Sequence, residues 1–567
     1  MPAHRDLRAL GLLLTILVAS AVPVSAQSGA DAAERRDISD AEWRADLLHF
    51  AEQMPQVHVD LYHTVSRGQF EHAVWDLYRS LPDLEDHEVT VELARIVAMI
   101  GDGHTRLWLT PNDANGFHQV PILLYWLDDG LYVLGITDEH SRAAGGRVVR
   151  IGNVDVEEAW ERVRNVVHRD NEMQIVSIAP RYLAIPEVLH ALRITDGVDE
   201  VTYTIVDRRG RRVEVELDAI PDAYLSRLSN RPFLIPSEGD RVRMVMAWGD
   251  LSEMPLWLSD PGNRFWYVYL PESRTMYVQL NGIRDKSDET MAAFFARVYA
   301  EVDRQQVDRL VLDLRHNGGG NNMLNLPVVH GIIERPELNR HGKVFVIISR
   351  HTFSAASHLV TYLERHTNAV FVGEPTGASP NHFGDAGPVD LPNSGLGIGA
   401  STMYWQNSLP RPFETRDWTP PDVSVAMTIE DFRTGRDPAM EAVLAYAETE
   451  SLIERMVAAL ESDGAEAALA VYRDFRADPK NAYASTETEI NSLGYQLLGA
   501  GRAEDAVAVF QLNADAYPQS ANVWDSLGDG YEAAGDIARA IASYARALQV
   551  DPGFAPSRAN LTRLTSR

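Results

Sequence analysis

The sequence predicts a multidomain α/β protein that ends in an all-helical repeat region. Its 567 residues allow about three to five domains of ordinary size. Between residues 275 and 374, apolar strand-like runs alternate with helical patterns, which is typical of βαβ units with a mostly parallel sheet. Near the C-terminus Leu493-Gly494 recurs as Leu527-Gly528, and equivalent positions stay 34 residues apart, which indicates an internal repeat.

Composition excludes several classes of function. The formal net charge is −29, and a surface this acidic repels phosphate backbones, so nucleic acid is not an expected partner. The chain has no cysteine, which removes disulfides, thiolate metal sites and a cysteine nucleophile. Lysine is almost as scarce, and its positions are Lys286, Lys343 and Lys480.

The N-terminus has the pattern of an export signal. Arg5 and Arg8 precede an apolar run from Leu10 to Val22, and small residues end at Ala26. We expect a signal peptide over residues 1–26, cut after Ala26, with an uncleaved anchor as the alternative. The predicted location of the mature protein is periplasmic or secreted, with no membrane span after cleavage.

Changes in periodicity divide the rest of the chain. Helical patterns dominate the first segment, where Ser39 and Glu42 form a capping-box signature. Short β-like runs follow, then a stretch rich in Pro, Ser, Asp and Arg, and then the α/β region. The predicted parts are an N-terminal helical domain (38–112), a β-rich module (113–221), a linker or irregular segment (222–265), an α/β core (266–445) and a helical repeat region (455–567).

The repeat region has a recognisable signature. The pattern W-x-x-L-G-x-x-Y, at Trp524, Leu527, Gly528 and Tyr531, resembles tetratricopeptide repeats. Two full copies are present, and such stacks usually need about three units. We expect a degenerate copy in 455–479, or the α/β core, to cover the open end. The resemblance implies a docking surface for a protein partner.

Two strand ends in the α/β region carry candidate chemistry. The run 309–315 leads into Gly318-Gly319-Gly320, whose backbone can approach a ligand closely and present amide hydrogens to negative charge. The run 343–349 leads to Ser354 at a strand-to-helix turn, where a serine can act as a nucleophile. Taken alone, Ser354 is also an ordinary helix N-cap.

Three segments together resemble one family of serine peptidases. They are 313–320 (DLRHNGGG), 352–356 (TFSAA) and 372–376 (VGEPT). The family contains the C-terminal processing (tail-specific) peptidases, the tricorn core peptidase and the interphotoreceptor retinoid-binding protein repeats, and the resemblance covers roughly residues 40–445. It implies a crotonase-like ββαβ catalytic core in which Ser354 is the nucleophile. The implied oxyanion-hole donors are the amides of Ala355 and of Gly318 or Gly319.

The general base separates two branches of this family. Tail-specific peptidases use a lysine, but Ser379 stands at that position here, and none of the three lysines replaces it. The tricorn-like branch uses a histidine from the helical domain, and His104, in Gly101-Asp-Gly-His-Thr105, matches it. An imidazole with an ordinary pKa of ~6.5 can accept the serine proton near neutral pH.

The remaining site residues follow from the same branch. Glu414 lies close to the position of the glutamate that orients the histidine, with one extra residue before the Pro-Asp pair, and Asp417 is the alternative. Gly103 stands where tricorn has a serine. His382 is a rival base or, with Asn381, a substrate contact.

Two further sequence patterns bear on ligand binding. The run 145–154 (GGRVVRIGNV), followed by a helix, is similar to the second half of a PDZ domain, which would bind a substrate's C-terminus by strand addition. His58 and His63 are isolated and no H-E-x-x-H motif occurs, so neither a metal nor another cofactor is expected.

Together these features predict a secreted serine peptidase. It would cleave peptide or protein substrates through an acyl-enzyme on Ser354, with His104 as base. The alternative is a catalytically degenerate peptidase fold that binds a peptide or an apolar ligand and docks a partner on its repeats. The missing lysine and the Glu414 spacing favour this alternative.

Overall fold

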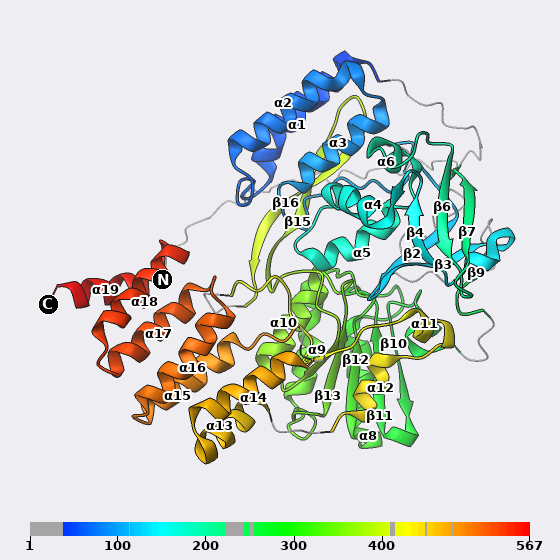
Figure 1. Cartoon of the computed structure of the whole chain (residues 1–567). Helices are drawn as coiled ribbons and strands as arrows, with labels where there is room; N and C mark the ends of the chain where they lie inside the picture. The colour runs from blue at the N-terminus through cyan, green and yellow to red at the C-terminus, as the bar shows by residue number, and fades with distance from the viewer. Residues whose placement is uncertain are drawn as a thin grey trace, which may run out of the picture. The chain divides into compact units, whose positions relative to one another are not determined.

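The computed structural model describes residues 38–112, 114–221, 243–249, 254–408, 414–447, 451–478, 481 and 483–566. The expected signal peptide lies outside these residues. Within them, no helix is both long and apolar enough to cross a membrane. The architecture is multidomain α/β, as the sequence predicts, with a helical N-terminal part, β-sheets, an α/β core and an all-helical C-terminal part (Figure 1).

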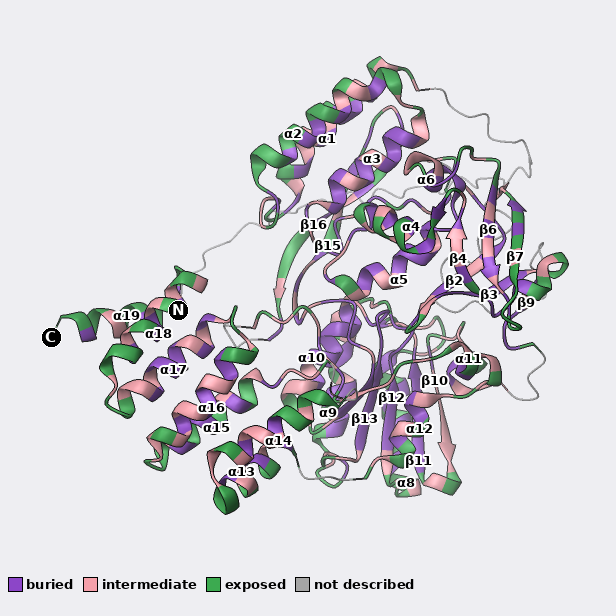
Figure 2. Cartoon of the chain, in the orientation of Figure 1, coloured by how far each residue is buried: buried purple, intermediate pink, exposed green. Residues whose placement is uncertain are grey.

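Three helices form the N-terminal part. The first two begin at capping boxes, made by Ser39 with Glu42 and by Ser66 with Gln69, which satisfy the first free amides of each helix. Their apolar faces, including Trp43, Leu47 and Phe50, are buried against one another (Figure 2). The helices are α1 (Asp40–Val57), α2 (Arg67–Ser80) and α3 (Asp86–Ala98), with a short 3-10 turn η1 (Leu81–Asp83).

A mostly antiparallel sheet follows, in the order β2-β3-β4-β6-β7. Burial alternates along its strands where one face meets solvent, as in β7. The strands are β2 (Ile122–Leu127), β3 (Gly130–Thr137), β4 (Arg147–Ile151), β6 (Glu200–Val206) and β7 (Arg212–Asp218), with β5 (Val154–Asp155) on β4, β9 (Met244–Met246) on β3, and a separate pair β1 (His118–Gln119) and β8 (Ile220–Pro221). Its helices are η2 (Asp138–Ala143), α4 (Val156–Val163), η3 (Arg164–Val166), α5 (Glu172–Tyr182) and α6 (Pro186–Ala191).

The segment expected to be irregular, 222–265, contains regular structure among its described residues. Strand β9 extends the β-module sheet, and helix α7 (Leu256–Ser259) buries Trp257 fully. Both elements have fewer than five residues, which is too short for a periodic pattern of apolar and polar residues to be recognised in the sequence.

The α/β core is built on a sheet in the order β10-β11-β12-β13-β14-β17. Only the β10–β11 pair is antiparallel, and every residue of β11 and β13 is buried because helices cover both faces. The strands are β10 (Phe265–Leu270), β11 (Thr275–Leu280), β12 (Arg309–Asp313), β13 (Val344–Ile348), β14 (Val370–Gly373) and β17 (Val423–Ser424). Helices α8 (Met291–Gln305), α9 (Leu326–Ile333) and α10 (Ala355–His366) contribute to the core on one face, and α12 (Pro438–Ala445) to that on the other; shorter elements are η5 (Pro271–Ser273), η6 (Asn322–Asn325) and α11 (Ile429–Thr434).

A long hairpin joins the core to the N-terminal helices. Its strands are β15 (Asn381–Asp390) and β16 (Gly397–Gln406), which pair with each other as a separate two-stranded sheet. Ser401 on β16 accepts a hydrogen bond from the Val59 amide through its carbonyl, and Gly399 pairs with Arg106. The hairpin therefore holds the segment after α3 beside the core (Figure 1).

The C-terminal part is all helical and is consistent with the predicted repeats. Gly494 and Gly528, 34 residues apart, lie against the aromatic rings of Phe510 and Tyr544 respectively, so the same close contact recurs in both copies. The helices α13 and α14 form a further pair at the end where the sequence suggested a degenerate copy. The helices are α13 (Leu452–Asp463), α14 (Ala465–Ala477), α15 (Glu487–Gly499), α16 (Ala503–Ala516), α17 (Ala521–Ala533), α18 (Ile537–Val550) and α19 (Ala555–Thr565).

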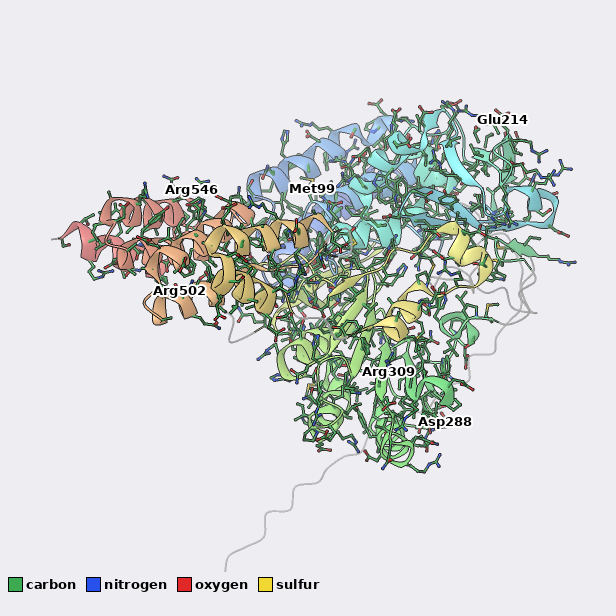
Figure 3. All side chains as sticks on the ribbon, turned by 60° about the horizontal axis from the view of Figure 1, so that its bottom comes forward. Met99, Glu214, Asp288, Arg309, Arg502 and Arg546 are labelled. Carbon is green, nitrogen blue, oxygen red and sulfur yellow. The ribbon has the colours of Figure 1, made fainter. Side chains whose placement is uncertain are left out.

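Many charged side chains are exposed. Glu214 on β7, Asp288 before α8 and Arg546 on α18 are examples, and each projects from the ribbon in Figure 3. Others, such as Asp102 and Asp313, are buried.

Replacing the repeat glycine at 528 should destabilise the C-terminal part. In Gly528→Ala the new Cβ would lie 2.4 Å from Cε1 of the buried Tyr544, so the two helices must separate. We expect a loss of about 1–3 kcal/mol in the free energy of unfolding. Gly499→Ala is the control, because nothing lies within 4 Å of its Cβ and alanine favours a helix. Calorimetric unfolding that ranks the two variants in the opposite order would contradict this packing.

Candidate active site

Ser354 lies at the sharp turn between β13 and α10. Its backbone angles, φ 54° and ψ −127°, fall in a region that residues other than glycine rarely adopt. The turn is held from both sides: Thr352 Oγ1 accepts from the Ser349 amide and donates to the Leu314 carbonyl, and the Phe353 amide donates to the Asn317 carbonyl. Such a strained residue persists only where its surroundings fix it, and this is typical of functional sites.

His104 meets Ser354 from a distant part of the chain. Its Nε2 lies 2.9 Å from Ser354 Oγ, a hydrogen bond between residues 250 positions apart. The imidazole stacks on Phe353, with ring centroids 4.6 Å apart and planes 25° apart. Gly103 is required beside it, since a Cβ there would lie 2.8 Å from the Phe353 ring. The structure therefore brings together the two residues that the resemblance singled out.

A buried carboxylate organises the loop that carries His104. Asp102 Oδ1 accepts hydrogen bonds from the amides of His104 (2.9 Å) and Thr105 (2.7 Å) and from Ser401 Oγ (2.7 Å). Asp102 Oδ2 lies 2.8 Å from His58 Nε2, and the Asp60 amide donates to His58 Nδ1, so Nε2 is the protonated nitrogen. Burial raises the pKa of Asp102, but the hydrogen bonds outweigh it and leave that pKa well below its ordinary value.

The sequence does not predict this pair. His58 is isolated along the sequence, yet its ring is fully buried against Asp102. The Asp-x-His spacing indicates only that Asp102 binds amides of its own loop, because an aspartate commonly accepts hydrogen bonds from amides two and three residues later.

The expected orienting acid lies elsewhere. Glu414 accepts hydrogen bonds from the Arg416 side chain, which also binds Glu364. His104 Nδ1 is buried and has no hydrogen-bond partner among the described residues, so neither Glu414 nor its alternative Asp417 accepts a proton from it in this structure. The physical reason is that an arginine two residues away, within the same turn, binds the Glu414 carboxylate.

Gly319, in the run Gly318-Gly319-Gly320, lies against Ser354. A Cβ on Gly319 would be 2.7 Å from Ser354 Cβ and 2.9 Å from the Ala355 nitrogen, and its φ of 102° favours glycine. The Gly319 amide already donates to Asn317 Oδ1 at 2.9 Å. In the described part of the chain, the amides of Gly318 and Ala355 donate no hydrogen bond, which leaves them available for a ligand oxygen.

A cavity of about 220 Å³ opens beside Ser354. His382 lines it, with Nε2 3.0 Å from His358 Nε2 and Nδ1 2.8 Å from the Ser379 carbonyl, so it is not bonded to Ser354. Asn381 lies at the start of the same strand and accepts from the amide and hydroxyl of Ser408. The complete lining is His104, Gly320, Asn321, Asn322, Ser354, Ala355, His358, His382, Gly384, Asp385 and Trp405.

At position 379, where the tail-specific peptidases have a lysine, this chain has a serine that makes other interactions. The Ser379 amide donates to Asp170 Oδ2 at 2.5 Å, and burial raises the pKa of Asp170 to about 7. Ser379 Oγ donates to the Asp417 carbonyl at 2.9 Å. Ser379 itself supplies no amine that could compete with His104 for the serine proton.

His104 is held in its neutral form. Burial, together with the nearby His382 and Arg106, lowers its pKa to about 3, and Asp102 opposes this shift. A neutral imidazole has a free lone pair on Nε2, which is what a general base needs. Among the described residues no group of three or more histidines and acids is arranged to hold a metal ion.

Comparison with known proteins agrees with the fold. Residues 274–424 match the model of Peptidase family S41, so the chain contains a domain of this family, as the resemblance predicted. A crystal structure of a CPAF mutant is 13% identical, with a TM-score of 0.51, and the match covers 72% of this chain and 99% of that chain.

Two further solved structures are similar. They are the photosystem II D1 C-terminal processing protease (15% identity, TM-score 0.33, 70% of this chain and 98% of that one) and the tricorn protease (12%, 0.28, 71% and 36%). No curated protein sequence matches. The family match supports a serine peptidase that acts on peptide or protein substrates.

The buried histidines predict a loss of stability in acid. Burial lowers the pKa of His104, His168 and His316 to about 3 and that of His358 to about 2. Below pH ~6.5 the unfolded chain binds a proton at each of them, whereas the folded chain does not, so stability falls as the pH falls. Each should cost about 1 kcal/mol at a pH of about 5.5. Asp170 and Asp422, whose pKa burial raises to about 7, bind protons in the folded chain at this pH and offset part of the loss.

Urea unfolding measured at about pH 7.5 and about pH 5.5 tests this prediction. We expect a clearly lower midpoint at the acidic pH, and a smaller difference in His168→Gln, which lacks one such group. Equal midpoints at the two pH values would show that these histidines are not buried in the neutral form.

Proposed function

We propose that the chain is a serine peptidase in which Ser354 is the nucleophile and His104 the general base. The observation that carries this proposal is the hydrogen bond of 2.9 Å between His104 Nε2 and Ser354 Oγ. Two segments 250 positions apart, one of them from the helical part, meet there at a strained turn. A helix N-cap needs neither the strain nor the histidine, and Ser354 makes no side-chain cap hydrogen bond.

The geometry supports a two-step acyl transfer. Ser354 Oγ attacks the substrate carbonyl carbon while His104 Nε2 takes the hydroxyl proton, and the amides of Ala355 and Gly318 donate to the oxyanion. The C–N bond then breaks, and His104 gives its proton to the leaving amine. Water, deprotonated by His104, hydrolyses the ester and restores both residues. Burial lowers the pKa of His104, so its imidazolium releases the proton readily to the amine, while the same shift makes the imidazole a weaker base in the first step.

One observation favours a second function, a binding protein on the same fold. His104 Nδ1 has no acceptor among the described residues, so no hydrogen bond at that nitrogen stabilises an imidazolium. In this alternative the cavity binds a peptide or an apolar ligand without cleaving it. The two functions differ in a single measurable property, covalent reactivity of Ser354.

Four further features are proposed on the sequence patterns. Export by a signal peptide would place the protein in the periplasm or outside the cell. The domain division, a PDZ-like role for the β module in binding a substrate's C-terminus, and docking of a protein partner on the helical repeats complete the proposal. Support for the last comes from the stacked helix pairs α15–α16 and α17–α18.

Removing the Ser354 hydroxyl should abolish covalent chemistry. We expect the intact protein to react with a fluorophosphonate probe and to cleave members of a mixed peptide library, and Ser354→Ala to do neither. Ser357→Ala is the matched control, since Ser357 lies one turn along α10 and donates to the Thr352 carbonyl instead. Absence of both reactions in the intact protein would support the binding alternative.

Asp102 and Glu414, the acid that the resemblance implies, should differ in importance for His104. Asp102→Asn removes the charge that pairs with His58 and disturbs the loop carrying His104, so we expect the rate of probe labelling to fall about tenfold or more. Glu414→Gln should have a smaller effect, because its carboxylate binds Arg416. Labelling rates measured at equal protein concentration compare them. A larger loss in Glu414→Gln would mean that Glu414 reaches His104 when substrate binds.

A further inference from the structure

We propose that the cavity beside Ser354 selects peptides with an arginine or lysine next to the cleaved bond, and that Asp385 determines this specificity. The proposal rests on the proposed peptidase function and names its substrate class. Four properties of the cavity carry it: the backbone of Asp385, its contact with Trp405, the charge of the lining and the size of the space.

Asp385 is turned into the cavity by an unusual backbone. Side chains alternate between the two faces of a strand, so His382 and Gly384 share one face and Asp385 belongs on the other. Yet Gly384 and Asp385 both line the cavity. The φ of Asp385 is 52°, and the pairs of β15 with β16 on either side of it, Gly384 with Met403 and Ala386 with Ser401, keep one register. The strand is therefore distorted at this residue without a shift of register, and the positive φ allows Asp385 to line the same cavity as Gly384.

Strain of this kind needs compensation. A non-glycine residue at positive φ costs of the order of 1 kcal/mol, and aspartate tolerates it better than most residues. The fold offsets the cost with two contacts: Trp405 Nε1 donates to Asp385 Oδ2 at 2.9 Å, and Thr402 Oγ1 donates to the Asp385 carbonyl. The second carboxylate oxygen, Oδ1, accepts no hydrogen bond from the described residues, so it can accept one from a ligand.

Trp405 adds a second attraction for a cation. It lines the same cavity and is held in place by the Asp385 hydrogen bond. An indole face attracts a guanidinium or ammonium group, and a carboxylate beside it strengthens that preference. A neutral or acidic side chain gains neither interaction.

The rest of the lining leaves the charge of Asp385 unopposed. Its other members are glycine, alanine, serine, asparagine, tryptophan and histidine. Burial lowers the pKa of each of the three lining histidines, so they are neutral near pH 7. Arg106, the cation near His104, binds the His104 carbonyl and stacks on Trp108, and it is not part of the lining.

The two inner histidines already satisfy each other. Asn322 Nδ2 donates to His358 Nδ1, so His358 Nε2 carries a proton and donates to His382 Nε2. His382 Nδ1 in turn donates to the Ser379 carbonyl. This chain leaves no unmet donor there for an acidic side chain, and Asp385 is the group with an unused hydrogen-bonding oxygen and a charge.

The volume fits one side chain. About 220 Å³ is below the roughly 300–1,000 Å³ of pockets that enclose a drug-sized ligand, and it suits a single long residue. Since Ser354 and Ala355 line the same space, that residue must flank the bond whose carbonyl reaches Ser354.

The test compares arginine with citrulline, its uncharged isostere, at each position flanking the cleaved bond of one peptide. In the intact protein we expect kcat/KM about tenfold higher for an arginine peptide at one of these positions. In Asp385→Asn the ratio should fall to about 1, because asparagine tolerates the same backbone and can still accept from Trp405 but carries no charge. Asp390→Asn, an exposed charge at the end of the same strand, should keep the ratio.

A binding measurement separates this proposal from the proposed function. Ser354→Ala is titrated with the same peptides by fluorescence anisotropy, which requires no turnover. We expect Ser354→Ala to bind the arginine peptide more tightly than the citrulline peptide. We expect the Ser354→Ala, Asp385→Asn double variant to lose this difference. That pair of results would support the cation site even if no peptide is cleaved. Cleavage or binding without an arginine preference, or a preference that survives in Asp385→Asn, would overturn the specificity proposal and leave the peptidase function intact.

Discussion

The candidate site depends on how the loop carrying His104 is fixed against the α/β core. That loop is anchored by Asp102, whose buried carboxylate receives two amides of the loop, the Ser401 hydroxyl of β16 and the His58 ring. Because β16 belongs to the hairpin that also lines the cavity beside Ser354, this carboxylate links the helical part to that hairpin. In this arrangement His104 lies within hydrogen-bond distance of Ser354.

The same hairpin serves two purposes. At one position it binds the loop of the general base, through Gly399 and Ser401. At its open end it provides His382, Gly384, Asp385 and Trp405 to the cavity beside Ser354. The proposed base and the proposed specificity residue thus depend on one element, and Asp385, at a positive φ, adds a charge to a lining that otherwise carries none.

Much of this arrangement could be predicted from the sequence. The alternation of strands and helices, the strand ends at Gly318 and Ser354, and the repeat spacing are local patterns, and the structure shows the elements they predict. The absence of a lysine at position 379 favours His104 as the base. What could not be predicted depends on contacts between distant segments: His58 pairs with Asp102 across 44 positions, and Glu414 is bound by Arg416 and not by His104. The positive φ of Asp385 is not predicted by composition or periodicity.

The central claim is that His104 activates Ser354. Mass spectrometric mapping of the fluorophosphonate adduct in the intact protein and in His104→Ala tests it most directly. The account predicts an adduct on the peptide containing Ser354, and its loss or a reduction of about a hundredfold or more in His104→Ala. An adduct on another serine, or undiminished labelling of Ser354 without His104, would contradict it.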